Sequence, residues 1–274
     1  MIGETMIPVP GGRIHVVDEG AGPPVLLLHA GIVDLRAWDP LVPHLLARGL
    51  RAIRYDARGY GATETEDVEF SDRADMVAVL DACDVRRACV VGNSRGGQIA
   101  VDAAIESPDR VGALLLLGAS VGGYEAPATP DEQALFAEME RLEEAGDPDA
   151  TADFDVRLWV DGPGQPPDRV PEAIREAVRA MDVAVGDPTR THGKPVRLEP
   201  PAGERLGELT MPILAMAGEL DVSDVRATAL HLQEACPNAI AELVPGVAHM
   251  IAMEVPELVA DRILALVRRA APMG

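Results

Sequence analysis

Long apolar segments, cysteines and signal-like features are scarce in this chain of 274 residues. No apolar run approaches the roughly 20 residues that a membrane-spanning helix needs. The first residues, Met1–Glu4, have neither the basic nor the apolar region of a secretory signal. We therefore expect a cytoplasmic protein that does not associate with membranes. The cysteines are odd in number, lack metal-ligand spacing, and are expected to be reduced thiols that pack as small hydrophobic residues: Cys83, Cys89 and Cys236.

Positive charge is also scarce. The chain has 24 Lys and Arg residues against 45 Asp and Glu residues, which gives a formal net charge of −21. Such a charge argues against nucleic acids and anionic membrane surfaces as partners, because both would be repelled. The histidines outside the site discussed below lack the spacing of metal ligands, so we expect no metal and no cofactor; these are His15, His44, His192 and His231.

The chain does contain an alternation of apolar strand-like runs and helix-like segments. With 47% hydrophobic residues it can bury the core of one large α/β domain. Strands alternating with helices predict a mostly parallel sheet with helices on both sides. The expected strands are Thr5–Pro10, Arg13–Asp18, Pro24–His29, Arg51–Tyr55, Arg87–Gly92, Val111–Leu117, Pro212–Ala217 and Ile240–Val244. The expected helices among them are Trp38–Ala47, Ser71–Cys83, Arg95–Glu106, Asp224–Glu234 and Val255–Arg269.

This alternation stops between about Gly122 and Gly207, where no convincing buried strand is found. Helical spacing and glycine breaks instead predict a group of helices inserted into the domain. Residues 1–121 and 208–274 would then form the core, and residues 122–207 a helical cap. The expected cap helices are Pro130–Ala145, Thr151–Val160, Val170–Val185 and a weaker one ahead of Pro195.

The most informative motif is Gly92-Asn93-Ser94-Arg95-Gly96, which joins a predicted buried strand to a predicted helix. A serine with glycine two residues before and after it, in this context, is typical of a nucleophile elbow. The turn is so sharp that the serine adopts a strained backbone conformation, and a side chain at either glycine would crowd its neighbours. The motif predicts Ser94 as a nucleophile exposed at the carboxyl end of the strand.

A serine nucleophile needs a base to accept its proton and an acid to orient that base. In elbow-type folds these residues follow in the order serine, acid, histidine. Here Asp221 follows the strand Pro212–Ala217, and His249 follows the strand Ile240–Val244, so both lie at the same sheet edge as Ser94. We favour Asp221 as the acid, because Asp224 is placed to cap the next helix. Asp224, Glu125 and Glu219 remain alternatives.

The negative charge that develops on a reacting carbonyl oxygen needs hydrogen-bond donors. The backbone N–H of Arg95, directly after the serine, is one candidate. The second candidate is the N–H of Gly31, in the loop after the strand Pro24–His29, where a glycine lets the backbone approach a substrate. We expect His29 to orient this loop rather than to take part in the reaction. The turn Asp56–Gly61 lacks the lysine of a phosphate-binding loop and is expected to be structural.

These motifs together resemble the α/β-hydrolase superfamily over nearly the full chain. The resemblance implies a mostly parallel eight-stranded sheet, with the helical cap between strands six and seven. Ala30 is a departure, since the family usually has a second glycine after the histidine of this loop. Among family members the chain is most similar to small microbial carboxylesterases and enol-lactonases. Haloalkane dehalogenases and epoxide hydrolases are disfavoured, because they carry aspartate where Ser94 stands.

The resemblance therefore implies a serine hydrolase that cleaves esters of small, mostly hydrophobic substrates through an acyl-enzyme. One alternative keeps the triad but cleaves a lactone or a C–C bond. The elbow Gly92–Gly97 also occurs in meta-cleavage C–C hydrolases, although the loop after His29 lacks their glycine-rich sequence. Another alternative is a ligand-binding protein on a hydrolase scaffold. The expected partner is a small ester or lactone, and the sequence leaves open whether the chain forms a homo-oligomer.

Overall fold

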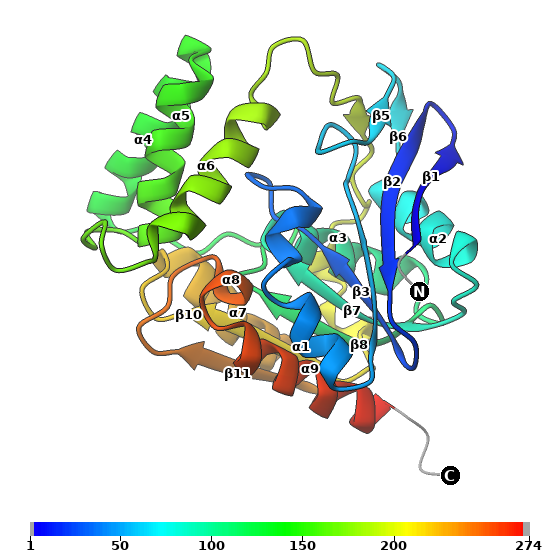
Figure 1. The fold of residues 1–274 in the computed structure, drawn as a ribbon. Helices are drawn as coiled ribbons and strands as arrows, with labels where there is room; N and C mark the ends of the chain where they lie inside the picture. The colour runs from blue at the N-terminus through cyan, green and yellow to red at the C-terminus, as the bar shows by residue number, and fades with distance from the viewer. Residues whose placement is uncertain (1–2, 271–274) are drawn as a thin grey trace.

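The computed structural model describes residues 3–270 and contains one large sheet with helices on both faces (Figure 1). Eight strands follow one another in the order β1-β2-β4-β3-β7-β8-β10-β11, and the short β5 also pairs with β2. The strands of this sheet are β1 Gly3–Val9, β2 Gly12–Glu19, β3 Pro24–Leu28, β4 Arg51–Tyr55, β5 Glu64–Thr65, β7 Ala88–Asn93, β8 Val111–Leu117, β10 Ile213–Gly218 and β11 Ala239–Val244.

Strand β2 is antiparallel to β1 and β4, and all pairs from β4 to β11 are parallel. The predicted mostly parallel α/β fold is therefore confirmed. The helices are η1 Leu35–Trp38, α1 Val42–Ala47, α2 Asp72–Ala82, α3 Arg95–Glu106, α4 Pro130–Ala145, α5 Pro148–Asp155, η2 Val156–Asp161, α6 Glu172–Val185, η3 Ala202–Glu204, η4 Leu206–Glu208, α7 Ser223–Ala235, α8 Ile251–Glu254 and α9 Pro256–Ala270. A second sheet pairs β6 Glu69–Phe70 with β9 Lys194–Pro195.

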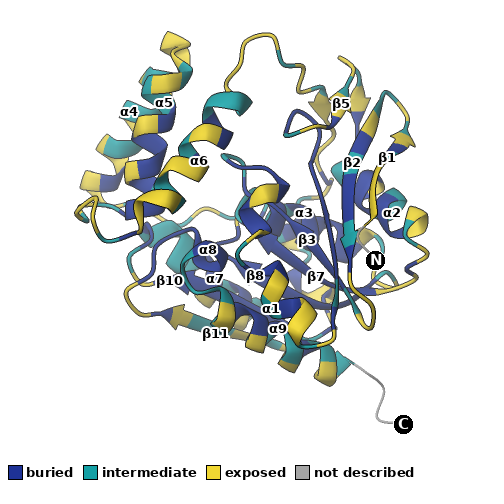
Figure 2. Ribbon diagram, viewed as in Figure 1, coloured by how far each residue is buried: buried dark blue, intermediate teal, exposed yellow. Residues whose placement is uncertain are grey.

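The central strands are buried on both faces, which explains their continuous apolar sequences (Figure 2). Successive side chains of β3 enter different hydrophobic clusters, because side chains alternate across a sheet. Leu26 and Leu28 pack with residues of α2, α3 and α7, whereas Val25 and Leu27 pack with residues of α1 and α9. The sheet is thus held between two helical layers, and its carboxyl edge is fixed in position.

Proline and local hydrogen bonds account for most differences from the expected helices. The segment Trp38–Ala47 is not one helix: η1 ends at Trp38 and α1 begins at Val42. Pro40 and Pro43 lack the N–H that a continuous helix would need there. The expected final helix, Val255–Arg269, is confirmed as α9, in which Pro256 is the first residue; the short α8 before it lies outside the expected range.

Within residues 122–207 the helix Pro130–Ala145 is confirmed as α4. The next helix begins earlier than expected, at Pro148, because the Asp147 side chain accepts a hydrogen bond from Ala150 N. The expected helix ahead of Pro195 is wrong. The Asp187 carboxylate there accepts hydrogen bonds from the backbone and hydroxyl of Thr189, which stabilises a turn instead.

Among the described residues, no helix is both long and apolar enough to cross a membrane. The three cysteines are free thiols, and Cys89 and Cys236 are buried, in agreement with their expected role as small hydrophobic residues.

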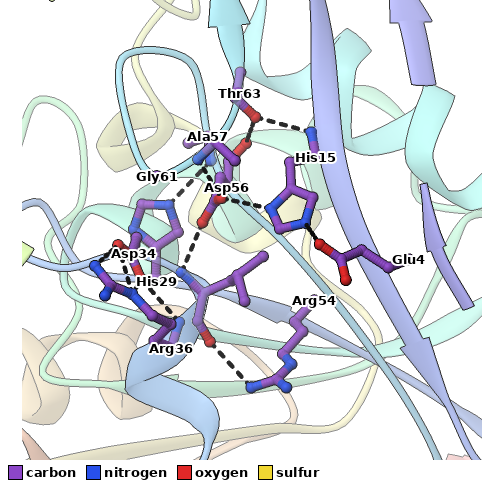
Figure 3. A network of polar contacts seen from close by, with 12 residues as sticks. Glu4, His15, His29, Asp34, Arg36, Arg54, Asp56, Ala57, Gly61 and Thr63 are labelled. Carbon is purple, nitrogen blue, oxygen red and sulfur yellow. Dashed lines mark hydrogen bonds and ion pairs between the residues drawn. The ribbon is translucent and has the colours of Figure 1, made fainter. Parts of the chain in front are cut away.

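The turn Asp56–Gly61 is held by the Asp56 carboxylate (Figure 3). Asp56 Oδ1 accepts a hydrogen bond from Leu35 N at 2.9 Å, and Oδ2 accepts one from Ala62 N at 2.8 Å. A Cβ atom on Gly61 would lie 2.1 Å from this carboxylate, so only glycine fits beside it. The structural role expected for this turn is confirmed.

The same carboxylate holds a charged histidine. His15 Nδ1 lies 2.8 Å from Asp56 Oδ2, and His15 Nε2 lies 2.9 Å from Glu4 Oε1 (Figure 3). Because ionised carboxylates only accept hydrogen bonds, both ring nitrogens must carry protons. Burial lowers the pKa of His15, but hydrogen bonds and charge attraction from Asp56 and Glu4 outweigh it, so the net pKa is raised. These contacts stabilise the imidazolium form of His15, which ties β1 and β2 to the turn.

We expect the replacement His15→Asn to remove a pH-dependent part of the stability. The raised pKa of folded His15 means that its contribution is complete below the unfolded pKa, near 6.5, and is lost as the pH rises through the folded value. Chemical denaturation at several pH values should show a wild-type advantage that is larger at pH 6 than at pH 9. Parallel pH profiles of the two proteins would contradict the charged state of His15.

Candidate active site

Ser94 lies at the junction of β7 and α3 in a strained backbone conformation, with φ 51° and ψ −117°. Such positive φ angles are unfavourable for residues other than glycine. The conformation is held by hydrogen bonds on both sides: Ser94 N donates to Leu117 O at 2.9 Å, and Gly97 N donates to Ser94 O at 2.8 Å. The side chain is partly exposed at the carboxyl end of the sheet. This is the geometry of a nucleophile elbow.

The two motif glycines are required by close packing. A Cβ atom on Gly92 would lie 2.3 Å from Gly96 O, and one on Gly96 would lie 2.2 Å from Leu28 O. Both distances are far below van der Waals contact with backbone atoms that cannot move freely. The glycines therefore allow α3 to start directly against β7 and β3.

The structure brings Asp221 and His249 together. Asp221 lies in the turn after β10, His249 follows β11, and His249 Nδ1 is 2.7 Å from Asp221 Oδ2. Both residues are almost fully buried. Because the carboxylate accepts the hydrogen bond, Nδ1 carries the proton, and Nε2 is left as the basic nitrogen. The second carboxylate oxygen, Asp221 Oδ1, accepts a hydrogen bond from Val222 N at 2.8 Å.

Three further residues place His249 beside the elbow. Asn93, directly before Ser94, donates from Nδ2 to Leu117 O at 2.9 Å and to His249 O at 3.4 Å. Gly118 follows β8, and a Cβ atom on it would lie 2.9 Å from His249 Nδ1. Trp159 O accepts a hydrogen bond from His249 N, and the two rings are 4.8 Å apart. The only sequence signal for these contacts is the position of Asn93 and Gly118 at strand ends.

The alternative acids do not contact the histidine. Asp224 Oδ1 accepts a hydrogen bond from Ala126 N at 2.8 Å, so the side chain fixes the segment after β8. The expectation that Asp224 caps its own helix is wrong, because α7 begins at Ser223. Glu125 and Glu219 are exposed on the surface. Among the four acids considered, Asp221 is the one hydrogen-bonded to His249.

Gly31 and Arg95, the expected donors to a carbonyl oxygen, lie next to each other. The Cβ position of Gly31 is 3.9 Å from Arg95 Cβ. Arg95 is the first residue of α3, and N–H groups of a first helical turn have no acceptor within the helix. The Arg95 guanidinium points elsewhere, since it donates to Asp72 Oδ1 at 2.9 Å.

His29 supports the loop that carries Gly31. Its Nε2 accepts a hydrogen bond from Ala57 N at 3.0 Å, so Nδ1 carries the proton and donates to Ala30 O at 2.8 Å. Burial lowers the pKa of His29, which agrees with this neutral state. Its contacts are those of a residue that orients the loop, as the sequence predicts.

Helices of the segment between β8 and β10 lie over this site. Figure 1 shows α4, α5 and α6 beside one another above the carboxyl end of the sheet. Residues of η2 and α6 form one hydrophobic cluster with the Gly31 loop and with the segment after His249; its members include Ala30, Val33, Val156, Val160, Val178, Met181, Met250 and Met253. The helices are therefore packed on the loops that carry the candidate groups.

Comparisons with known proteins agree with this fold. Residues 25–262 match the model of the alpha/beta hydrolase family. The chain is 29% identical to rhodomycin D methylesterase DauP of Streptomyces sp. (strain C5), over 93% of this chain and 94% of that protein. It is 38% identical to 2-hydroxymuconate semialdehyde hydrolase of Pseudomonas sp. (strain CF600), over 48% of this chain and 50% of that one. Among solved structures it resembles Est816, an N-acyl homoserine lactone degrading enzyme, with a TM-score of 0.68 and 23% identity, covering 95% of this chain and 99% of that one.

Proposed function

We propose that this chain, which belongs to the alpha/beta hydrolase family, hydrolyses carboxylic esters through Ser94, His249 and Asp221. The observation that carries the proposal is the 2.7 Å hydrogen bond between Asp221 and His249, at the same sheet edge as a serine in an elbow conformation. This bond leaves His249 Nε2 as the free base. A serine hydroxyl is a weak nucleophile without such a base.

The reaction would proceed in two halves. His249 Nε2 takes the Ser94 proton as the oxygen attacks the ester carbonyl, and the Asp221 carboxylate stabilises the resulting imidazolium. The N–H groups of Gly31 and Arg95 donate to the carbonyl oxygen as it becomes negative. The imidazolium then protonates the leaving alcohol, and water attacks the acyl-enzyme with His249 again as the base.

Residues 122–207 would act as a helical cap over the core formed by residues 1–121 and 208–274. Leu135, Phe154 and Leu158 of the cap helices line part of a cavity of about 490 Å³, and the charged residues Arg157, Asp161 and Arg175 line another part of it. The apolar part of this lining supports a mostly hydrophobic acyl or alcohol group in the substrate.

A second candidate is cleavage of a lactone or of a C–C bond with the same three residues. Two similarities support this second candidate. The chain resembles an N-acyl homoserine lactone degrading enzyme and 2-hydroxymuconate semialdehyde hydrolase. Full-length similarity to a methylesterase is the reason for placing ester hydrolysis first.

A panel of esters, lactones and vinylogous diketones at equal concentration tests the proposal. We expect the highest kcat/KM for esters, and we expect a fluorophosphonate probe to modify Ser94, as mass spectrometry of the peptide would show. A protein that is modified at Ser94 but prefers lactones or diketones supports the second candidate. Failure of the probe to react with Ser94 would instead favour a ligand-binding protein on this scaffold.

A further inference from the structure

An acidic cavity lies beside the loop that carries Gly31. It has a volume of about 250 Å³ and is lined by Gly31 and Ile32 on one side and by α5, α6 and the end of α4 on the other. Its ionisable lining residues are all acidic: Glu143, Asp147, Asp155 and Asp182. No lysine, arginine or histidine lines it. The cavity therefore presents acidic side chains on the side of the Gly31 loop that faces the cap helices.

Two of these acids, Asp155 of α5 and Asp182 of α6, are buried against each other. Their exposed fractions are 3% and 7%. In the described part of the chain, neither Asp155 Oδ1 nor Asp182 Oδ2 receives a hydrogen bond from a donor group. Burial raises the pKa of both carboxyl groups, and the charge of Asp155 raises the pKa of Asp182 further. Two buried carboxyl groups in contact without a cation are costly to ionise, so they share a proton.

Among residues 3–270, no basic side chain forms an ion pair with Asp155 or Asp182. Arg179 of α6, the basic residue nearest to Asp182 in the sequence, is turned to exposed Asp149 and Asp153. Among residues 3–270 no group of three potential metal ligands is found, which argues against a metal ion as the missing charge. A ligand with positive charge and N–H donors would satisfy both carboxylates and replace the shared proton. An ammonium group has these properties.

The cavity adjoins the proposed reaction centre at Gly31. Gly31 lines the cavity and also lies against Arg95, its proposed partner in binding the carbonyl oxygen. Trp159, one helical turn after Asp155, contacts the His249 ring. A substrate whose carbonyl oxygen is held by Gly31 can therefore extend a chain toward the acidic pair.

We propose that Asp155 and Asp182 form a binding subsite for an ammonium group at the end of the acyl or alcohol chain of an ester substrate. This inference rests on the proposed ester hydrolysis and narrows its substrate class. Asp155 and Asp182 act as specificity-determining residues, because they contact the ammonium group rather than the reacting atoms.

The test uses matched pairs of esters, one neutral and one cationic. In the cationic ester (CH₃)₂NH⁺– replaces (CH₃)₂CH– at the end of a chain of two to five carbons. The chain belongs to the acyl part in one series and to the alcohol part in the other. The two groups have nearly the same shape and differ in charge and in one N–H donor. With the best chain length, we expect kcat/KM for the cationic ester to exceed that for the neutral ester by about tenfold or more, as charge-assisted hydrogen bonds predict. In Asp182→Asn this ratio should fall at least threefold.

The variant Glu140→Gln is the matched control, because it removes a carboxylate exposed on α4 that does not line the cavity. It should retain the wild-type ratio. An equal ratio of cationic to neutral kcat/KM in wild type, Asp182→Asn and Asp155→Asn would overturn the subsite. A fall of this ratio in Glu140→Gln as large as that in the two buried variants would overturn it as well. Loss of the ratio only in the two buried variants supports it.

A binding measurement separates this proposal from the proposed reaction. In the Ser94→Ala variant, 2-(dimethylamino)ethanol should raise the midpoint temperature of thermal unfolding more than 3-methylbutan-1-ol does. The additional substitution Asp182→Asn should abolish this difference. A selective shift without any ester hydrolysis by the wild type would retain the subsite and refute the reaction. Hydrolysis of both ester types at equal rates, with no selective shift of the midpoint, would retain the reaction and refute the subsite.

Discussion

Ester hydrolysis should fall by about 10⁴-fold or more in kcat when Ser94 is replaced by alanine. Without the hydroxyl no acyl-enzyme can form, and only binding and the Gly31 and Arg95 donors remain to accelerate direct attack by water. Steady-state kinetics with p-nitrophenyl acetate measures this change. KM is expected to change far less than kcat, because the serine oxygen contributes little to the binding of the ground state.

The control is Ser120→Ala, which removes an exposed hydroxyl close to the end of β8. Within the described residues its hydroxyl donates a hydrogen bond to Gln98 of α3 alone, at 3.4 Å, so activity should stay close to that of the wild type. Circular dichroism and unfolding midpoints should show that Ser94→Ala is folded, since a smaller side chain fits the same elbow. Undiminished turnover by folded Ser94→Ala would refute Ser94 as the nucleophile.

The fold and the candidate site could be predicted from the sequence where one local pattern has one structural solution. The elbow is such a case, because Gly92 and Gly96 are fixed by contacts with backbone atoms nearby. The placement of Asp221 and His249 also follows from the order of strands and residues along the chain. Both come after parallel strands, and the carboxyl ends of such strands meet at one sheet edge.

The contacts missed by sequence analysis depend on three-dimensional packing between distant segments. Asn93 reaches a carbonyl 156 residues away, and nothing in its neighbours indicates that contact. The burial of Asp155 and Asp182 is equally hard to predict, because each residue lies on an amphipathic helix where an acid is usually solvent-exposed. Only the packing of α5 against α6 buries them, and helix periodicity cannot predict which faces of two such helices meet.

Replacing Asp221 by asparagine should lower kcat by about 10³–10⁴-fold, although the side chain keeps its size. Val222 N donates to Asp221 Oδ1, so the amide oxygen of the new residue is expected to take that position. Its NH₂ group would then face His249 Nδ1, which could no longer carry a proton there. The proton would move to Nε2, and His249 would lose the basic nitrogen that accepts the Ser94 proton.

The comparison with Asp224→Asn decides between the two acids. Asp224 accepts a hydrogen bond from Ala126 N, whereas His249 is hydrogen-bonded to Asp221, so the replacement of Asp224 should affect stability rather than turnover and leave kcat within about threefold of the wild type. The kinetics of both variants, measured with the same ester, should differ by more than two orders of magnitude. The reverse order, with an active Asp221→Asn and an inactive Asp224→Asn, would require His249 to change its acid partner during the reaction. The buried 2.7 Å contact between His249 and Asp221 argues against such a rearrangement, because breaking it would leave a buried carboxylate without its strongest donor.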